Sequence, residues 1–125
     1  MARSVRLLAA LAVVSFVASA ASAAGDAAAG KKNFDTLCFT CHGSTGAGDG
    51  PAGAALNPPP RNFQKGDFKF DANKDGKPGE DADLHLVIQN GAGAYGGNPA
   101  MAPWGHLPAK DIDDLIAYIR TLKKK

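Results

Sequence analysis

Cysteine is scarce in this chain of 125 residues, and the two that occur stand in one pentapeptide, Cys38-Phe39-Thr40-Cys41-His42. No disulfide can therefore link distant parts of the fold. Large apolar side chains are also sparse between residues 43 and 77, where glycine and proline are frequent. Something other than side chains or a disulfide has to complete the core, and a buried cofactor would do so.

An excess of charge of either sign is missing as well. The formal net charge is +2, from 14 Lys and Arg against 12 Asp and Glu. Arg3 and Arg6 account for this excess, because the rest of the chain keeps 14 − 2 = 12 basic residues against 12 acidic ones. A balanced chain lacks the clustered basic surface that nucleic acids require, so nucleic-acid binding is not expected.

The first residues are typical of an export signal: Arg3 and Arg6 precede an apolar run from Leu7 to Val17, and small residues follow. We predict a signal peptide over residues 1–23, cleaved before Ala24, and a periplasmic domain over residues 24–125. An uncleaved anchor is the alternative, since about 18 residues lack charge and a spanning helix needs roughly 20. Alanine and serine in the second half favour cleavage, and hence no stable membrane insertion.

Helical periodicity predicts an all-α domain. A first helix is expected over residues 26–37, capped by Asp26, with Phe34 and Leu37 on its inner face. A second is expected over 81–90 and ends at Gly91, and a flexible loop follows over 91–97. The last helix has Pro108 in its first turn and is the clearest, with apolar residues at helical spacing: Ile112, Leu115, Ile116, Ile119 and Leu122. Turn signals fill residues 43–77, and no strand is expected.

The pentapeptide Cys-x-x-Cys-His is the attachment signal for c-type haem. Two intervening residues let both thiols reach neighbouring vinyl groups, and the adjacent histidine then falls beneath the iron. Cys38 and Cys41 are thus predicted to bind one covalent haem c, with His42 as the proximal ligand. A thioredoxin-like dithiol would need a βαβ setting, and a structural zinc site would need four ligands; the sequence offers neither.

The second axial ligand can be sought by elimination. After signal cleavage the chain keeps one methionine, Met101, and two further histidines, His85 and His106. Met101 follows a glycine-rich loop and precedes the last helix, and a thioether is a soft ligand suited to haem iron. We therefore predict Met101 as the ligand, with gap-filling in the core as its structural alternative and each histidine as a competing ligand.

These features together make the sequence resemble the class I cytochrome c family. The matching segments, in order, are the first helix at Gly25–Phe34, the haem motif, the loop Gly48–Gly53, and Met101–Leu122. The resemblance implies a class I cytochrome c fold of short helices and loops around one haem. In it the first and last helices cross, and Gly30 and Phe34 pack against Tyr118.

The resemblance also implies further residues around the haem. A proline carbonyl accepts the second N–H of the proximal histidine in this family, and Pro51 is the candidate here; such a bond orients the ring. Trp104 is expected beside the haem edge, with plain core packing as the alternative. Arg61 follows three prolines and could pair with a haem propionate, or remain solvated.

Residues 71–76, Asp-Ala-Asn-Lys-Asp-Gly, match the pattern at the start of an EF-hand calcium loop. The twelfth position should be glutamate but is Ala82, so Asp81 or Asp83 would have to substitute. A polar surface turn is the preferred interpretation.

The predicted function is one-electron transfer between redox proteins by a monomer that is not an enzyme. One alternative is a haem enzyme or small-molecule binder with an open sixth site. The other is a subunit fixed to a dehydrogenase or oxidase, which the near-neutral charge slightly favours because electrostatic steering needs charge asymmetry.

Overall fold

The computed structural model describes residues 24–125, and the predicted signal peptide lies outside them. Every regular element in this range is helical, as predicted. The α-helices are α1 (Ala27–Leu37), α2 (Phe39–His42), α3 (Asp81–Asn90) and α4 (Ala109–Thr121). Two short 3-10 helices, η1 (Phe63–Lys65) and η2 (Ala92–Tyr95), interrupt the connecting loops.

Helix α1 begins directly after Asp26, the predicted capping residue. The Asp26 carboxylate accepts hydrogen bonds from the backbone N–H groups of Ala28 at 2.8 Å and Ala29 at 3.3 Å. Phe34 is completely buried, whereas Leu37 is only half-buried. The inner face of α1 is therefore centred on Phe34 rather than shared equally with Leu37.

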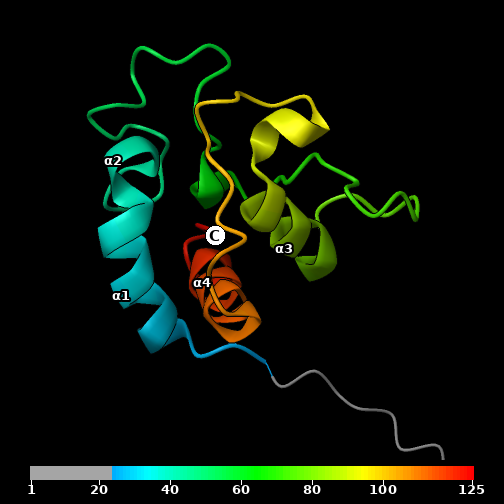
Figure 1. The fold of residues 1–125 in the computed structure, drawn as a ribbon. Coiled ribbons are helices and arrows are strands. Elements are labelled where there is room, and N and C mark those ends of the chain that lie inside the picture. The colour runs from blue at the N-terminus through cyan, green and yellow to red at the C-terminus, as the bar shows by residue number, and fades with distance from the viewer. Residues whose placement is uncertain (1–23) are drawn as a thin grey trace, which may run out of the picture.

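Helices α1 and α4 pack closely against each other, which confirms the predicted crossing of the first and last helices (Figure 1). A Cβ atom on Gly30 would lie 1.8 Å from the Asp114 carbonyl oxygen, so only glycine permits this approach. The Phe34 ring meets the Tyr118 ring edge-on, with 5.1 Å between ring centroids. Gly30 thus lies against the α4 backbone, and Phe34 supplies the contact with Tyr118.

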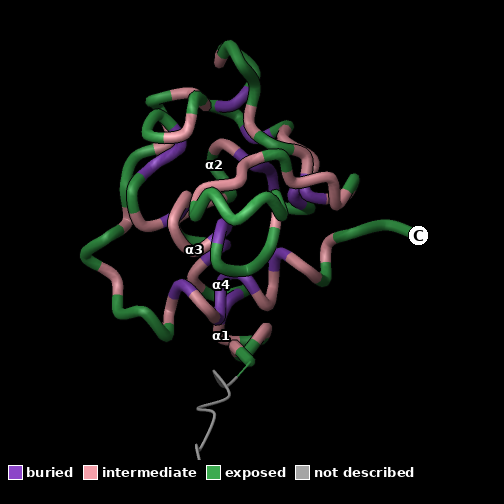
Figure 2. The backbone as a smooth tube through the Cα atoms, turned by 90° about the vertical axis from the view of Figure 1, so that its right-hand side faces the viewer, coloured by how far each residue is buried: buried purple, intermediate pink, exposed green. Residues whose placement is uncertain are grey.

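Helix α4 lies between α1 and α3 and contacts both (Figure 1). Pro108 caps it from just before its first turn. Buried residues gather along α4 in Figure 2. The side chains at its core are those that periodicity predicts: Ile112, Leu115, Ile116 and Ile119. Leu84 and Ile88 of α3 join the same core.

The segment after α3 contains a helical turn where the sequence predicts only a loop. Within residues 91–97, Ala92–Tyr95 forms η2. Gly91 and Gly96 flank it with φ angles of 80° and 83°, which glycine adopts without strain. The N–H of Gly97 closes the turn on the Ala92 carbonyl at 2.9 Å. The glycines therefore bracket a compact turn.

The acidic loop before α3 uses its carboxylates to hold backbone. Asp71 accepts hydrogen bonds from the N–H groups of Asp75 at 3.0 Å and Gly76 at 2.9 Å. Asp83 likewise accepts from Ala72 at 2.7 Å. Across residues 24–125 the structure brings together no group of three or more His, Cys, Asp or Glu side chains that could hold a metal ion. Carboxylates that accept hydrogen bonds from the loop's own backbone are typical of a polar surface turn, which is the interpretation preferred from the sequence.

Candidate haem site

His42 lies at the end of α2, directly after the two cysteines, and only 8% of its surface is exposed. The helix ends there because Gly43 takes a φ of 80°, which turns the chain away from the helical path. The carbonyl of His42 then accepts a hydrogen bond from the N–H of Gly48 at 2.8 Å. The Gly43 turn and the hydrogen bond from Gly48 therefore fix the backbone that carries the imidazole.

The carbonyl that orients the His42 ring belongs to Arg61, so the expectation of Pro51 is wrong. Nδ1 of His42 lies 3.1 Å from the Arg61 oxygen. This placement follows from a long-range bond, because the N–H of Phe63 donates to the Gly46 carbonyl at 2.7 Å and draws the neighbouring chain to the ring. Pro51 instead lies in an exposed turn. A proton on Nδ1 leaves the Nε2 lone pair available to a metal.

The aromatic ring of Phe63 holds the imidazole from its face. The two ring centroids are 4.4 Å apart and the planes differ by 15°. Burial lowers the pKa of His42 below its usual value, and the opposing effect of the Arg61 hydrogen bond is smaller. Burial therefore favours the neutral ring, which is the form that binds iron.

A small cavity of about 70 Å³, partly open to solvent, adjoins His42. It brings His42 and Met101 together although they are far apart in the sequence. Most of its wall is apolar, which suits a porphyrin. The remaining lining residues are Arg61, Phe63, Phe68, Lys69, Phe70, Asp83, Leu84, Val87, Ile88 and Ile119.

Met101 reaches this cavity from a loop that packs against η2. Its N–H donates to the Asn98 carbonyl at 3.1 Å, and its carbonyl accepts from the Ala92 N–H at 3.3 Å. The two competing histidines lie elsewhere: His85 pairs with Asp113 at 2.9 Å between Nδ1 and Oδ1, and neither it nor the exposed His106 lines the cavity.

Both cysteines are free thiols on the turn that precedes His42. Burial, followed by the charge of Cys41, raises the pKa of the Cys38 thiol to about 12. A dithiol oxidoreductase needs a lowered thiol pKa, and its motif opens a helix after a strand, whereas Cys38 follows helix α1. The donor set and the apolar cavity fit covalent haem, with Cys38 and Cys41 as the thioether donors.

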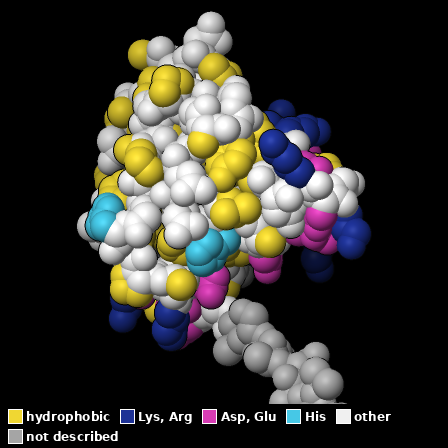
Figure 3. All heavy atoms as spheres, turned by 45° about the vertical axis from the view of Figure 1, so that its right-hand side comes forward, with side chains coloured by type: hydrophobic (Ala, Val, Ile, Leu, Met, Phe, Trp, Pro, Cys, Tyr) yellow, Lys and Arg dark blue, Asp and Glu magenta, His cyan; other side chains and the backbone are white. Residues whose placement is uncertain are grey.

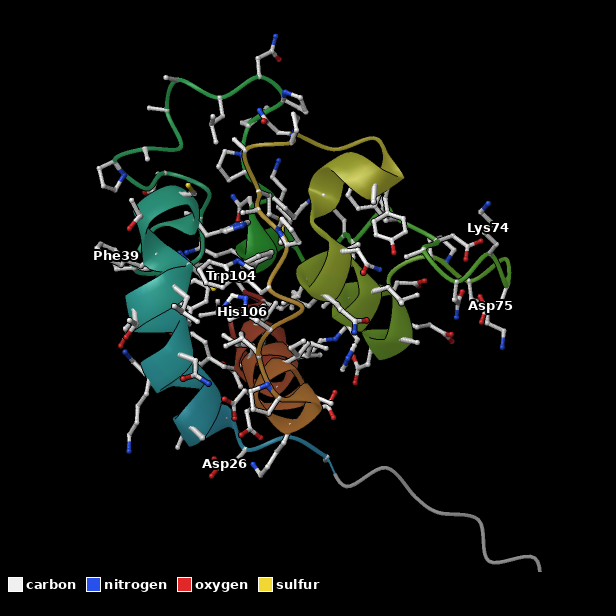
Figure 4. The ribbon with its side chains drawn as sticks, viewed as in Figure 1. Asp26, Phe39, Lys74, Asp75, Trp104 and His106 are labelled. Carbon is white, nitrogen blue, oxygen red and sulfur yellow. The ribbon has the colours of Figure 1, made fainter. Side chains whose placement is uncertain are left out.

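The two remaining predicted residues occupy different positions. Trp104 packs against the core beside His106, at 5.5 Å between ring centroids (Figure 4), and does not line the cavity. This arrangement matches its core-packing alternative. Arg61 does line the cavity, and its Nη1 lies 3.6 Å from Oδ1 of Asp67.

Sequence reasoning missed four lining residues at this site: Phe63, Phe68, Lys69 and Phe70. All four stand in the glycine- and proline-rich segment, where no helical period marks which residues face inward. The three phenylalanines are large apolar residues in a segment that has few of them, and that was the one available signal. Lys69 carries no comparable mark.

The cytochrome c family model matches residues 27–123, which is nearly all of the described chain. His42 and Met101 line the apolar cavity, and Cys38 and Cys41 precede His42 in the chain without lining it. This donor set is typical of haem-binding electron-transfer proteins. The chain is a member of the cytochrome c family, and this membership implies covalently bound haem and electron transfer.

A chain of the reducing HAO-like protein complex of Kuenenia stuttgartiensis is similar in structure, with a TM-score of 0.64 and 28% sequence identity. The match covers 76% of this chain and 41% of that one, so it spans less than half of the solved chain. Among curated proteins, none matches this sequence. Within residues 24–125, no helix has both the length and the hydropathy needed to cross a membrane.

Proposed function

We propose that this chain is an exported one-electron carrier with a single haem c whose iron is held by His42 and Met101. The observation that carries the proposal is the shared cavity: a buried nitrogen ligand and the chain's sole thioether after signal cleavage line the same apolar space. Haem bound there supplies a redox centre that takes up and releases one electron. Methionine ligation and burial both raise its potential.

The protein's own part is to fix the ligands and to exclude water. The Arg61 carbonyl and the Phe63 ring hold the imidazole, so little reorganisation accompanies a change of charge at the iron. The apolar wall would shield an iron bound there from solvent. With His42 and Met101 both holding the iron, no position would be left for a small molecule to react, which distinguishes a carrier from a haem enzyme.

Replacement of the thioether tests the proposal. Ferric wild-type holoprotein should have the weak long-wavelength band of iron–thioether coordination, and Met101→Ala should lose it. The midpoint potential of the variant should fall by on the order of 0.1 V. Absorption spectra and a redox titration provide the two measurements.

His85→Ala and His106→Ala are the matched controls, since each removes a competing ligand. Both should keep the band and the potential of the wild type. A high-spin wild-type spectrum with rapid carbon monoxide binding would contradict the carrier and support a haem enzyme or ligand binder with an open sixth site.

Export and haem number have direct tests. The intact mass of purified protein should correspond to residues 24–125 plus one haem. A mass that includes residues 1–23 would contradict cleavage before Ala24. Migration of the native protein as a monomer supports a diffusing carrier, and co-elution with a dehydrogenase or oxidase supports the fixed subunit.

A further inference from the structure

Three charged residues line the cavity beside His42: Arg61, Lys69 and Asp83. The Arg61 and Lys69 side chains keep 40% and 60% of their surface in contact with solvent. Asp83 differs from them, because only 1% of its surface is exposed. Solvent and salt screen the charge of an exposed side chain and leave a buried charge much less screened. Of the three, Asp83 therefore carries the charge that acts most strongly inside this cavity.

The two cations are also balanced by a carboxylate of their own. Nη1 of Arg61 lies 3.6 Å from Oδ1 of Asp67, and Nζ of Lys69 lies 3.3 Å from Oδ2 of the same residue. Asp83 has no such partner, since none of the ion pairs formed within residues 24–125 includes it. The cavity wall thus combines two paired, exposed cations with one buried anion.

Backbone dipoles hold Asp83 in its ionised form. Its carboxylate accepts hydrogen bonds from the N–H groups of Ala72 at 2.7 Å, Asn73 at 3.2 Å and Glu80 at 3.0 Å. Asp83 is also the third residue of α3, where the helix dipole favours a negative charge. Burial opposes ionisation, but the backbone hydrogen bonds outweigh it and keep the pKa below its usual value of 3.8. The side chain is therefore negatively charged at neutral pH.

Most other acidic side chains lie at the molecular surface. On the face in Figure 3 the charged side chains gather at the right-hand side and the lower edge. Within residues 24–125 one further acidic residue is buried, Asp114, which is 2% exposed. It does not line the cavity, and Nζ of Lys110 lies 2.6 Å from its Oδ2. Asp114 is therefore a carboxylate of similar burial whose charge is neutralised outside the cavity wall.

We propose that Asp83 lowers the reduction potential of the iron bound by His42, because its buried negative charge stabilises the ferric state. The proposal rests on the carrier function proposed above. The ferric site has one more positive charge than the ferrous site, so a carboxylate in the same cavity wall as His42 favours it. Two unit charges about 10 Å apart in a medium of effective dielectric constant about 20 change such an equilibrium by roughly tenfold. Asp83 thus opposes the effect of methionine ligation, and the reduced protein gives up its electron more readily.

Asp83→Asn removes this charge and keeps the shape of the side chain. Spectroelectrochemical titration of the holoprotein measures the ratio of ferrous to ferric iron at each applied potential. At a fixed potential this ratio should be about tenfold higher in the variant than in the wild type, which corresponds to a midpoint about 59 mV higher. Because Asp83 is buried, the difference should be the same at low and high salt.

Two further variants separate the charge from the fold. Asp114→Asn removes a similarly buried carboxylate that does not line the cavity, so it should lower the free energy of unfolding and leave the midpoint unchanged. Asp83→Glu keeps the charge but disturbs the hydrogen bonds from Ala72 and Glu80, so its midpoint should stay close to that of the wild type. All three variants should keep the wild-type absorption spectrum, which shows that the iron ligands are unchanged.

Denaturant titration of both oxidation states gives a readout that a merely structural role would not change. An ionised Asp83 stabilises the folded ferric protein more than the folded ferrous protein. The rise in the unfolding equilibrium constant caused by Asp83→Asn should therefore be about tenfold greater for the ferric protein than for the ferrous one. Equal losses of stability in the two states would assign Asp83 to the fold alone and overturn the proposal.

A midpoint of Asp83→Asn equal to that of the wild type would also overturn the proposal, and so would an equal rise in Asp114→Asn or in Asp83→Glu. Each of these results leaves the carrier function in place, because the wild type still takes up and releases one electron. Absence of a reversible one-electron titration of the wild type, by contrast, would contradict the carrier function and this proposal with it.

Discussion

The crossing of α1 and α4 and the cavity beside His42 are built in opposite ways. At the crossing, Gly30 brings two helix backbones together and Phe34 is completely buried, so the chain fills the interior with its own atoms. On the other side of α4, the walls supplied by η1, α3 and the Met101 loop surround a cavity of about 70 Å³ that is partly open to solvent. The crossing is packed by the chain alone, whereas the cavity lies where we propose that haem binds.

This difference separates intrinsic stability from stability that depends on the cofactor. A close-packed contact loses stability when a single methyl group is forced into it. A region built around a ligand gains stability from whatever binds the folded state alone. Variants at the crossing should therefore unfold the protein, whereas variants at the cavity should change the redox site as well.

Gly30→Ala should have the largest effect. The added Cβ would meet the Asp114 carbonyl oxygen and carbon, and both atoms belong to the α4 backbone, which cannot move without displacing the helix. We expect a loss of about 4 kcal/mol or more in the free energy of unfolding, measured by denaturant titration followed by circular dichroism.

Gly76→Ala is the control for this substitution. No atom lies within 4 Å of the Cβ it would add, so it tests backbone strain alone at a φ of 85°. The expected loss is about 1 kcal/mol. A smaller loss for Gly30→Ala than for this control would show that α1 and α4 are not in backbone contact.

The buried face of α4 and the attachment turn could be predicted from the sequence, the crossing of α1 and α4 followed only from the family resemblance, and most of the cavity wall could not be predicted. Helical periodicity identifies the buried face of α4, and the Cys-x-x-Cys-His spacing identifies the attachment turn. Both are local patterns. The carbonyl that orients His42 comes from Arg61, nineteen residues along the chain, because Phe63 pairs with Gly46. No local pattern records such a long-range bond, so the choice of Pro51 failed.

Phe63→Ala should have the second largest effect and should act on both regions. Phe63 stacks on His42 and also meets Phe34 at 6.3 Å and Phe68 at 5.9 Å between ring centroids. Removal of the ring should lower the free energy of unfolding by about 3 kcal/mol. It should also loosen the imidazole, so the midpoint potential measured by redox titration should shift.

Phe63→Leu separates these two roles, because it keeps most of the buried volume and removes the stacked ring. We expect it to recover most of the stability and to keep the altered potential. Recovery of the wild-type potential by leucine would mean that Phe63 fills space without orienting His42.

Asp83→Asn should have the smallest of the three effects, and it concerns the cavity side. Asp83 is 1% exposed and lines the cavity. Its carboxylate accepts hydrogen bonds from three backbone N–H groups, those of Ala72 at 2.7 Å, Asn73 at 3.2 Å and Glu80 at 3.0 Å. The amide of asparagine turns a donor toward one of them, and the expected loss is about 2 kcal/mol in the free energy of unfolding at neutral pH.

The pH dependence of this loss gives the sharper test. Burial opposes ionisation of Asp83, but the backbone hydrogen bonds outweigh it and hold the pKa below its usual value of 3.8. A lowered folded-state pKa stabilises the protein fully above pH 3.8, and this stabilisation disappears as the pH falls through the folded-state pKa. The difference in unfolding free energy between wild type and Asp83→Asn should therefore be constant near neutrality and shrink in acid. A difference that does not shrink as the pH falls from 3.8 through the folded-state pKa would mean that folding does not lower the pKa of Asp83.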